Sequence, residues 1–170
     1  MAAPSTLISV EEYLRTVTDP DCEFVRGVLE ERAVGEYDHS TWQTILAAFF
    51  NALPPERGIK ARTELRVQVA PDNFRVPDIT LLSRNAPREQ IITHSPVAVF
   101  EILSPEDSMT RMLAKLADYE TMGIGAIWLI EPKKQLCFRY RNGQLTPETV
   151  LELPGRSLRV QLAEIAALAD

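Results

Sequence analysis

The fold of this chain is decided by residues 97–131, which read VAVFEILSPEDSMTRMLAKLADYETMGIGAIWLIE. The first part, Val97 to Leu103, is apolar on both faces except for Glu101, which is typical of a central strand covered on both sides. Ser104-Pro105 ends this strand. A buried strand that carries one carboxylate is the feature from which the rest of the interpretation follows.

A helix and a second strand follow at once. Met109 to Met122 is predicted to be helical, because Met109, Met112, Leu113, Leu116 and Tyr119 form an i, i+3, i+4, i+7 stripe and Gly123 closes it. Ala126 to Ile130 is the next buried strand. Two parallel strands joined by a helix make a right-handed βαβ crossover. We therefore predict the α/β (α+β) class, with a mixed central sheet flanked by helices.

The N-terminal half supplies shorter elements. Ser9 and Glu12 form a capping box that opens a helix to about Arg15, and residues 22–32 read as a hairpin that turns at Gly27. Asp38 or Ser40 is expected to cap an apolar helix over residues 41–53, which Pro54-Pro55 stops.

Alternating residues mark the next strands. From Thr63, the side chains of Leu65, Val67 and Val69 share one face, and we expect this strand to pair antiparallel with a strand over residues 76–82. Residues 133–142, 150–153 and 157–160 are predicted peripheral strands, followed by a helix over residues 162–168.

Composition sets limits on the function. The chain has 170 residues, 45% of them apolar, and a net charge of −6 with a pI near 5.0, which favours one domain over residues 1–170 and argues against non-specific coating of nucleic acid. Cys22 and Cys137 have no partner at ligand spacing, which argues against a disulfide framework or a zinc site. The sequence shows no signal peptide and no membrane span, so we expect a cytoplasmic protein without a membrane partner.

Two carboxylates stand out. Burying an ionised carboxylate is costly without compensation, so Glu101 needs a partner: a cation, backbone groups or an arginine. Asp78, after Pro77, is either a turn residue or a second ligand, and its strand is expected to lie beside that of Glu101. Together with the backbone carbonyl of Ile102, the pair could hold Mg²⁺, or Mn²⁺, and leave positions for a phosphate oxygen and a nucleophilic water.

Three stretches carry a family resemblance: RVPDITLLS at 75–83, AVFEILSPEDS at 98–108 and KLADYETMGIGAIWLIEP at 115–132. Together they resemble the Uma-two family, a restriction endonuclease family of the PD-(D/E)XK nuclease superfamily. CEFVRGVLEE at 22–31 and DHSTW at 38–42 are weaker matches. The resemblance implies a restriction-endonuclease-like core with peripheral antiparallel strands.

Site residues transfer by position. Pro77-Asp78 matches the PD element, and Glu101-Ile102-Leu103 matches (D/E)XK with Leu103 in place of lysine. In the family a lysine from the next helix takes over, and here it matches Lys115. From helix geometry alone, Lys115 could either face the sheet edge or extend its ammonium into water.

The resemblance also suggests supporting residues. Glu23 is a candidate for an additional carboxylate near the metal, and His39 and Tyr119 are candidates for groups that support the ligands. Arg111 is a candidate phosphate contact. In a short charged hairpin Glu23 could equally be a solvated side chain, and His39 could be only a helix-start residue.

Two functions of different kinds follow. The first is a Mg²⁺-dependent endonuclease that cleaves DNA with Asp78, Glu101 and Lys115 as catalytic residues. The second is a nuclease fold that has lost catalysis and binds nucleic acid or protein, which Leu103 and the acidic net charge favour. A hydrolase of another substrate class has no distinctive motif here. The expected partners are DNA, a second copy of the chain and a separate DNA-targeting protein.

Overall fold

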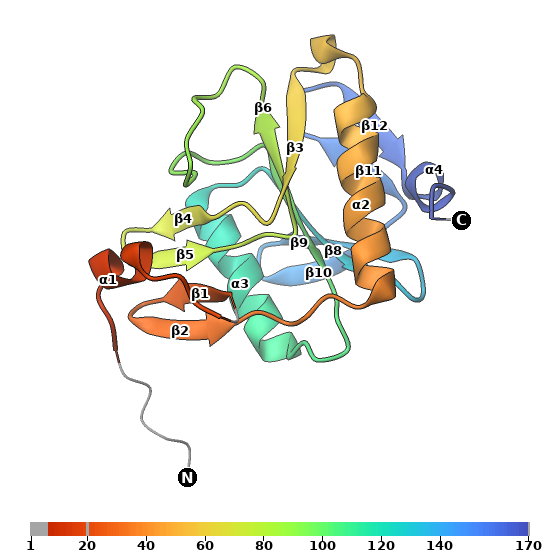
Figure 1. Cartoon of the computed structure of the whole chain (residues 1–170). Helices are drawn as coiled ribbons and strands as arrows, with labels where there is room; N and C mark the ends of the chain where they lie inside the picture. Colours follow the sequence, from red (N-terminus) through yellow and green to blue (C-terminus); the bar gives the residue numbers. More distant parts are fainter. Residues whose placement is uncertain (1–6, 20, 170) are drawn as a thin grey trace.

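The computed structural model describes residues 7–19 and 21–169 and arranges them around a six-stranded and a four-stranded β-sheet, with a separate two-stranded sheet, β11-β12 (Figure 1). The helices are α1 (Val10–Arg15), α2 (Tyr37–Ala52), η1 (Pro55–Arg57), α3 (Met109–Met122) and α4 (Leu162–Ala166). The strands are β1 (Cys22–Val25), β2 (Val28–Glu31), β3 (Ile59–Thr63), β4 (Val67–Ala70), β5 (Asn73–Arg75), β6 (Ile79–Ser83), β7 (Ala98–Ile102), β8 (Ala126–Glu131), β9 (Leu136–Arg141), β10 (Gln144–Glu148), β11 (Val150–Leu153) and β12 (Leu158–Gln161).

The central sheet has six strands in the order β10-β9-β8-β7-β6-β3. Strands β7 and β8 pair in parallel across α3, with Glu101 opposite Leu129, whereas the other neighbours in this sheet are antiparallel. The predicted mixed sheet and the βαβ unit are therefore confirmed.

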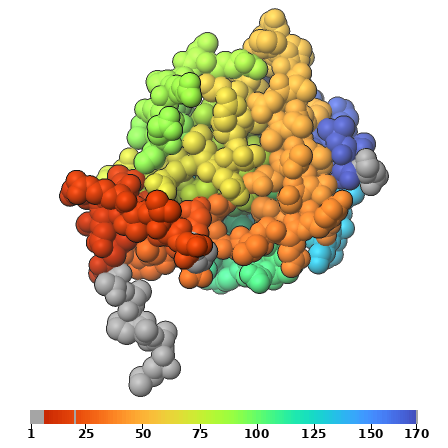
Figure 2. All heavy atoms as spheres, viewed as in Figure 1, coloured from red at the N-terminus to blue at the C-terminus, as the bar shows by residue number. Residues whose placement is uncertain are grey.

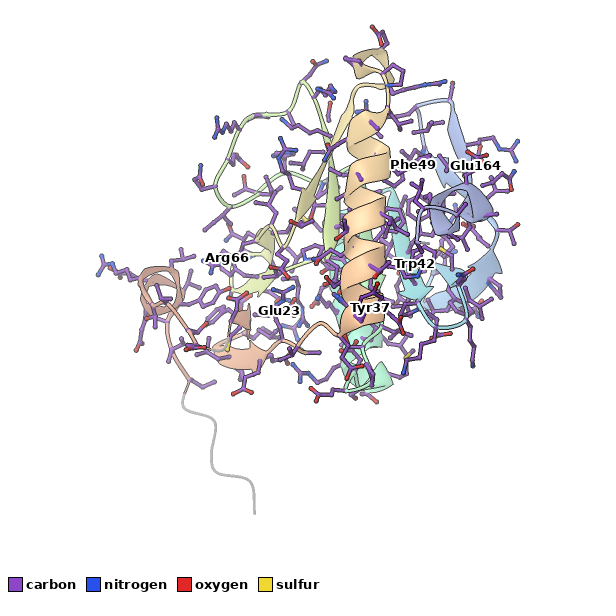
Figure 3. All side chains as sticks on the ribbon, turned by 45° about the vertical axis from the view of Figure 1, so that its right-hand side comes forward. Glu23, Tyr37, Trp42, Phe49, Arg66 and Glu164 are labelled. Atoms are coloured by element: carbon purple, nitrogen blue, oxygen red, sulfur yellow. The ribbon has the colours of Figure 1, made fainter. Side chains whose placement is uncertain are left out.

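The two faces of the sheet bury different helices (Figure 1). Phe100 and Trp128 stack at 4.8 Å on the face covered by α2, α4 and the β11–β12 hairpin. In Figure 3, Trp42 and Phe49 lie on the flank of α2 that faces these C-terminal elements. Because side chains alternate along a strand, Val99 and Glu101 lie on the opposite face. That face is covered by α3.

A second sheet, β2-β1-β5-β4, stands beside α3. Tyr13 of α1 packs on Phe24 and Phe74 of this sheet, with the Tyr13 and Phe24 rings 5.0 Å apart. The capping box of α1 is confirmed, since the Ser9 side chain accepts the backbone N–H of Glu12. The candidate site lies between this second sheet and the central sheet.

Four expectations need correction. The stretch from Thr63 is not one strand: Thr63 ends β3, Glu64 has a left-handed backbone (φ 49°), and β4 begins only at Val67. The two strands join different sheets: β3 pairs with β6, and β4 pairs with β5. Apart from Thr63, which lies opposite Ile79, the expected pairing of residues 63–69 with residues 76–82 is therefore wrong.

Helix α2 begins earlier than expected. Its N-cap is Glu36, and Ser40 already donates its N–H to the Glu36 carbonyl, so Asp38 lies in the first turn, where a negative charge is favourable. In α3, Met109 and Leu113 are exposed, and the buried stripe is Met112, Leu116 and Tyr119. The polar edge strand β10, which contains Pro147, was not predicted.

Among residues 7–19 and 21–169, no helix combines the length and the apolar character that a membrane span requires.

Candidate active site

A cavity of about 230 Å³ opens where the two sheets meet. Figure 2 shows the surface hollowed at this place, beside the segment that leads into α2. The predicted site residues other than Tyr119 gather on its wall, together with two further arginines. The lining includes Glu23, Arg32, His39, Arg75, Asp78, Glu101, Ile102, Arg111 and Lys115.

Asp78 lies at the entrance to β6 and is 5% exposed. Its Oδ2 accepts the backbone N–H of Ile102 at 2.7 Å and lies 3.3 Å from His39 Nε2. Arg32 NH2 is 3.6 Å from the other oxygen. Burial alone would raise the pKa of Asp78, but the hydrogen bond from His39 and the charge of Lys115 outweigh it and lower the pKa. Asp78 is therefore held as a carboxylate.

Glu101 is 2% exposed and faces α3. Its Oε1 accepts the Tyr119 hydroxyl at 2.6 Å, and its Oε2 accepts Lys115 Nζ at 2.8 Å. Burial, opposed by the charge of Lys115 and reinforced by the carboxylates of Asp78 and Glu23, raises its pKa to about 8. The negative charge of Glu101 is thus less fully compensated than the negative charges of Asp78 and Glu23.

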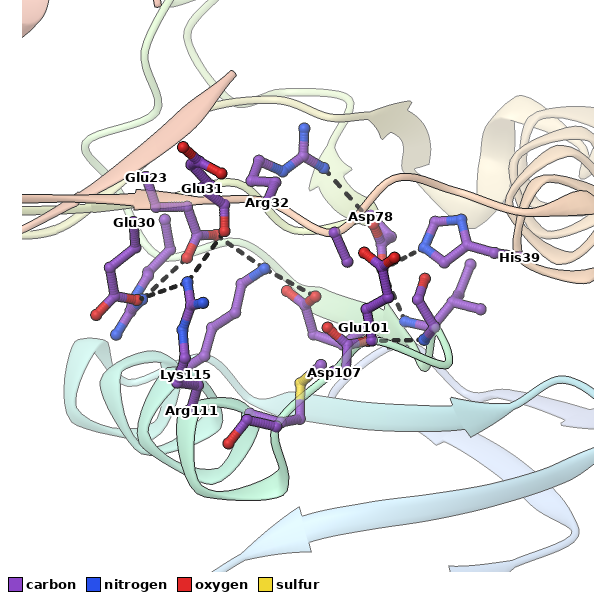
Figure 4. Close-up of a pocket in the computed structure, with 17 residues that line it drawn as sticks. Glu23, Glu30, Glu31, Arg32, His39, Asp78, Glu101, Asp107, Arg111 and Lys115 are labelled. Carbon is purple, nitrogen blue, oxygen red and sulfur yellow. Dashed lines mark hydrogen bonds and ion pairs between the residues drawn. The ribbon is translucent and has the colours of Figure 1, made fainter. Parts of the chain in front are cut away.

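Lys115 extends from α3 into the cavity (Figure 4). Its ammonium lies 2.8 Å from Glu101 Oε2, 2.8 Å from Glu23 Oε1 and 3.1 Å from the Val76 carbonyl oxygen. Burial alone would lower its pKa, but the charges of Glu101 and Glu23 raise it above the ordinary value. The ammonium therefore does not extend into water, and it stays charged.

Leu103, which stands where the motif has lysine, packs against the core under α3. It follows Glu101 by two residues, so it lies on the same face of the sheet. The cation reaches Glu101 from the helix instead. Sequence reasoning had left the direction of Lys115 open, and the structure brings Lys115 and Glu101 together.

Glu23 is buried in β1 at 4% exposure. Burial would raise its pKa, but the charges of Lys115 and Arg75 lower it. Oε2 accepts Arg75 NH1 at 2.9 Å, and Oε1 accepts the Val76 N–H at 2.8 Å in addition to contacting Lys115. The reading of Glu23 as a solvated side chain is therefore wrong.

Arg32 and Arg75 were missed. Arg75 lies between the buried residues Phe74 and Val76. An arginine between apolar residues of an extended segment is unusual, and this signal in the sequence could have identified Arg75 as a site residue. Arg32 follows the hairpin and bonds Asp21 at 3.1 Å, and nothing in its local sequence marks it. Arg111 lies on the rim, 55% exposed, and donates to the Glu31 carbonyl at 3.0 Å.

The chemistry of these groups suits a hard cation. No cluster of three or more His, Cys, Asp or Glu side chains is placed for metal binding among residues 7–19 and 21–169. Mg²⁺, however, is commonly held by one or two carboxylates and keeps several waters. Asp78 and Glu101 bring two such carboxylates to one cavity.

The fold and this acidic cavity define a protein of the restriction-endonuclease-like class. The chain matches the Uma2 family, described as "Putative restriction endonuclease", over residues 10–166 and belongs to that family. No curated protein matches it.

Two solved structures are similar to the chain. One is the crystal structure of a "putative nuclease" from Anabaena variabilis ATCC 29413, with 26% identity and a TM-score of 0.81, covering 96% of this chain and 99% of that one. The other is a cryo-EM structure of a DrdV–DNA complex, with 18% identity and a TM-score of 0.41, covering 75% of this chain and 10% of that one.

Proposed function

We propose that this chain is a Mg²⁺-dependent endonuclease that hydrolyses phosphodiester bonds of DNA. The observation that carries the proposal is that the Lys115 ammonium lies 2.8 Å from Glu101 in the cavity that Asp78 also lines. Two carboxylates and one fixed cation are the groups that metal-assisted phosphoryl transfer requires. Membership of a family described as "Putative restriction endonuclease" supports this reaction class.

Asp78 and Glu101 would hold the Mg²⁺, with the backbone carbonyl of Ile102 as a third oxygen ligand, and Mn²⁺ is the expected substitute. The bound cation supplies a Lewis acid that neutralises charge on the scissile phosphate and increases the acidity of water. Asp78 is already ionised, with its carboxylate oriented by Ile102 and His39. Glu101 would ionise fully if a bound cation compensated its charge.

Lys115 is assigned the electrostatic role. Its ammonium stabilises the negative charge that develops on the phosphate, as the lysine of the (D/E)XK element would. Tyr119 and Glu23 support it by orienting Glu101 and the ammonium. Arg111, exposed on the rim, is assigned the role of binding a phosphate of the substrate. Its guanidinium contacts Glu30 only through a long, exposed bond of 3.4 Å, which a phosphate can replace.

The test is a cleavage assay on supercoiled plasmid and on single-stranded DNA with Mg²⁺ or Mn²⁺. Glu101→Gln and Lys115→Met remove the two groups with little change of volume, and each is expected to lower cleavage by ~10²–10³-fold. Their matched controls are Glu164→Gln and Lys134→Met, which alter exposed residues outside the cavity and should leave the rate unchanged.

Each negative outcome has a distinct meaning. Cleavage that survives in both Glu101→Gln and Lys115→Met would overturn the assignment of these residues. A wild-type chain that binds DNA without cutting it under any of these conditions would support the second function, an interaction module, for which Leu103 is the motivating residue.

The acidic chain has few cations to spare for the DNA backbone, with 18 Lys and Arg against 24 Asp and Glu. We therefore propose that a second copy of the chain or a DNA-targeting partner completes the binding surface, and that a homodimer cuts both strands. Sedimentation with and without a DNA duplex measures this assembly.

A further inference from the structure

The candidate site contains one buried arginine to which the proposed reaction assigns no task. Arg75 is 3% exposed and lies at the end of β5. Its guanidinium bonds three carboxylates: Glu23 at 2.9 Å, Glu30 at 3.1 Å and Asp118 at 2.7 Å. These acceptors lie on β1, β2 and α3, so Arg75 joins the second sheet to the helix that carries Lys115.

The contact with Glu23 fixes one end of a short chain of bonds. Arg75 holds Glu23 Oε2, and the next residue, Val76, donates its N–H to Glu23 Oε1. Since both oxygens are held, the plane of the carboxylate is set. The oxygen that faces Lys115 is Oε1, 2.8 Å from the ammonium.

The same two residues act on Lys115 by a second route. The Val76 carbonyl accepts from Lys115 Nζ at 3.1 Å. Asp118, which Arg75 bonds through both Nε and Nη2, follows Lys115 by three residues and therefore lies beside it on the helix surface. Arg75 thus holds the helix that carries the lysine as well as one acceptor of its ammonium.

We propose that Arg75 is a positioning residue that places the Lys115 ammonium against Glu101 by orienting Glu23 and anchoring α3. The inference rests on the proposed function, in which Lys115 is catalytic. A lysine has a flexible stem and a single point charge, so its position is set by its acceptors. Misplacing a charge-stabilising group by about 1 Å is enough to reduce catalysis strongly.

The charges explain why an arginine is needed. Without Arg75, Glu23 would have only Lys115 as a cationic partner, and the ammonium would be drawn from Glu101 toward Glu23. Planar guanidinium can bond several carboxylates at once, whereas an ammonium cannot hold them in a plane. Arg75 therefore leaves the charge of Lys115 available to Glu101 and the substrate.

The first experiment measures kcat and KM for plasmid cleavage by Arg75→Met, Arg75→Lys and the control Arg159→Met, an exposed arginine in the β11–β12 hairpin. Arg75→Met is expected to lower kcat by about 10–100-fold with KM for DNA unchanged, and Arg75→Lys to recover part of the loss. Unchanged kcat in Arg75→Met would overturn the inference.

The second experiment does not depend on activity. Lysine acetylation by acetic anhydride, followed by mass spectrometry, measures how exposed Lys115 is relative to Lys134 in the same molecule. In Arg75→Met the labelling of Lys115 should rise at least several-fold, and in Arg159→Met it should not. Labelling of Lys115 that stays at the wild-type level in folded Arg75→Met would overturn the inference.

Two further comparisons distinguish a failure of folding from a failure of the proposed function. If Arg75→Met fails to fold, Asp118→Asn and Glu23→Gln weaken the same bonds without removing the buried cation, and both should raise Lys115 labelling. If the wild type cuts no DNA, a rise in labelling still supports the positioning contact, while the missing cleavage counts against the proposed function alone.

Discussion

Asp78 accepts the backbone N–H of Ile102 at 2.7 Å, which ties the first acidic residue of the site to the strand that carries the second. Strands β6 and β7 are already neighbours, with Ile79 opposite Phe100. The separation of Asp78 and Glu101 is thus set by a sheet register and a backbone bond, and not by side-chain rotamers alone.

Replacing Asp78 should separate its structural role from its chemical one. Asp78→Asn keeps an oxygen for the Ile102 N–H but loses the charge, and Asp78→Ala leaves that N–H unsatisfied. Both should abolish cleavage, and Asp78→Ala should be less stable than Asp78→Asn by about 1–3 kcal/mol. Urea denaturation of the three proteins at pH 7 measures this, and equal stability of the two variants would contradict it.

The raised pKa of Glu101, about 8, predicts a pH-dependent stability. Between pH ~4.5 and ~8 the folded chain keeps this proton while the unfolded chain has lost it, so the Glu101 contribution to folding falls as pH rises. Glu101→Gln cannot lose a proton. Relative to wild type, its free energy of unfolding should therefore rise steadily from pH 5 to pH 8.

This difference isolates Glu101 from its neighbours. The lowered pKa values of Asp78 and Glu23 act below pH ~4.5, and the raised pKa of His39 is caused mainly by Asp78, in spite of burial, with Glu101 as the smallest of its causes. Urea denaturation of wild type and Glu101→Gln at several pH values from 5 to 8 measures this difference. If the difference in the free energy of unfolding does not change with pH, Glu101 ionises normally.

Cation binding should release a proton. Because Glu101 is largely protonated at pH 7 and must ionise to act as a ligand, Mg²⁺ binding should displace about one proton and tighten as pH rises toward 8. Titration calorimetry in two buffers of different ionisation enthalpy counts the protons. An equal heat of Mg²⁺ binding in both buffers would argue against Glu101 as a ligand. In the same preparation, EDTA should abolish cleavage.

Tyr119 should support activity through its hydroxyl. Tyr119→Phe removes the 2.6 Å bond to Glu101 Oε1 and is expected to cost about 1–3 kcal/mol of stability and about 10-fold in cleavage rate. Tyr13→Phe is the matched control, because that hydroxyl bonds the Cys22 carbonyl away from the cavity. A similar loss of activity in both variants would assign the effect to folding.

Much of the site was predictable because its central part is local. Glu101 and Lys115 lie on consecutive elements of one βαβ unit, whose patterns are strong, and Asp78 lies on the adjacent strand. The contacts of Glu23 with Arg75 and Lys115 were not predictable, since they join β1, β5 and α3. The spacing of apolar residues along the sequence predicts single strands and helices, but it does not predict how one sheet packs beside another.

The errors have a similar origin. The alternation of Leu65, Val67 and Val69 suggested a strand that starts at Thr63, but the left-handed backbone of Glu64 ends β3 there, and β4 begins only at Val67. Glutamate is not a residue that marks such a conformation. What fixes it is tertiary: the Glu64 N–H is bonded to the Asp78 carbonyl.

The meeting of the two sheets at the cavity also sets an order of events during synthesis. A chain on the ribosome that ends before α3 already contains the carboxylates of Glu23 and Glu101, yet it lacks the Lys115 ammonium that both of them contact. Lys115 arrives only with the crossover, and the parallel partner of β7 follows it. A nascent chain therefore lacks the assembled contacts of Lys115 with Glu23 and Glu101 until α3 and β8 have been made.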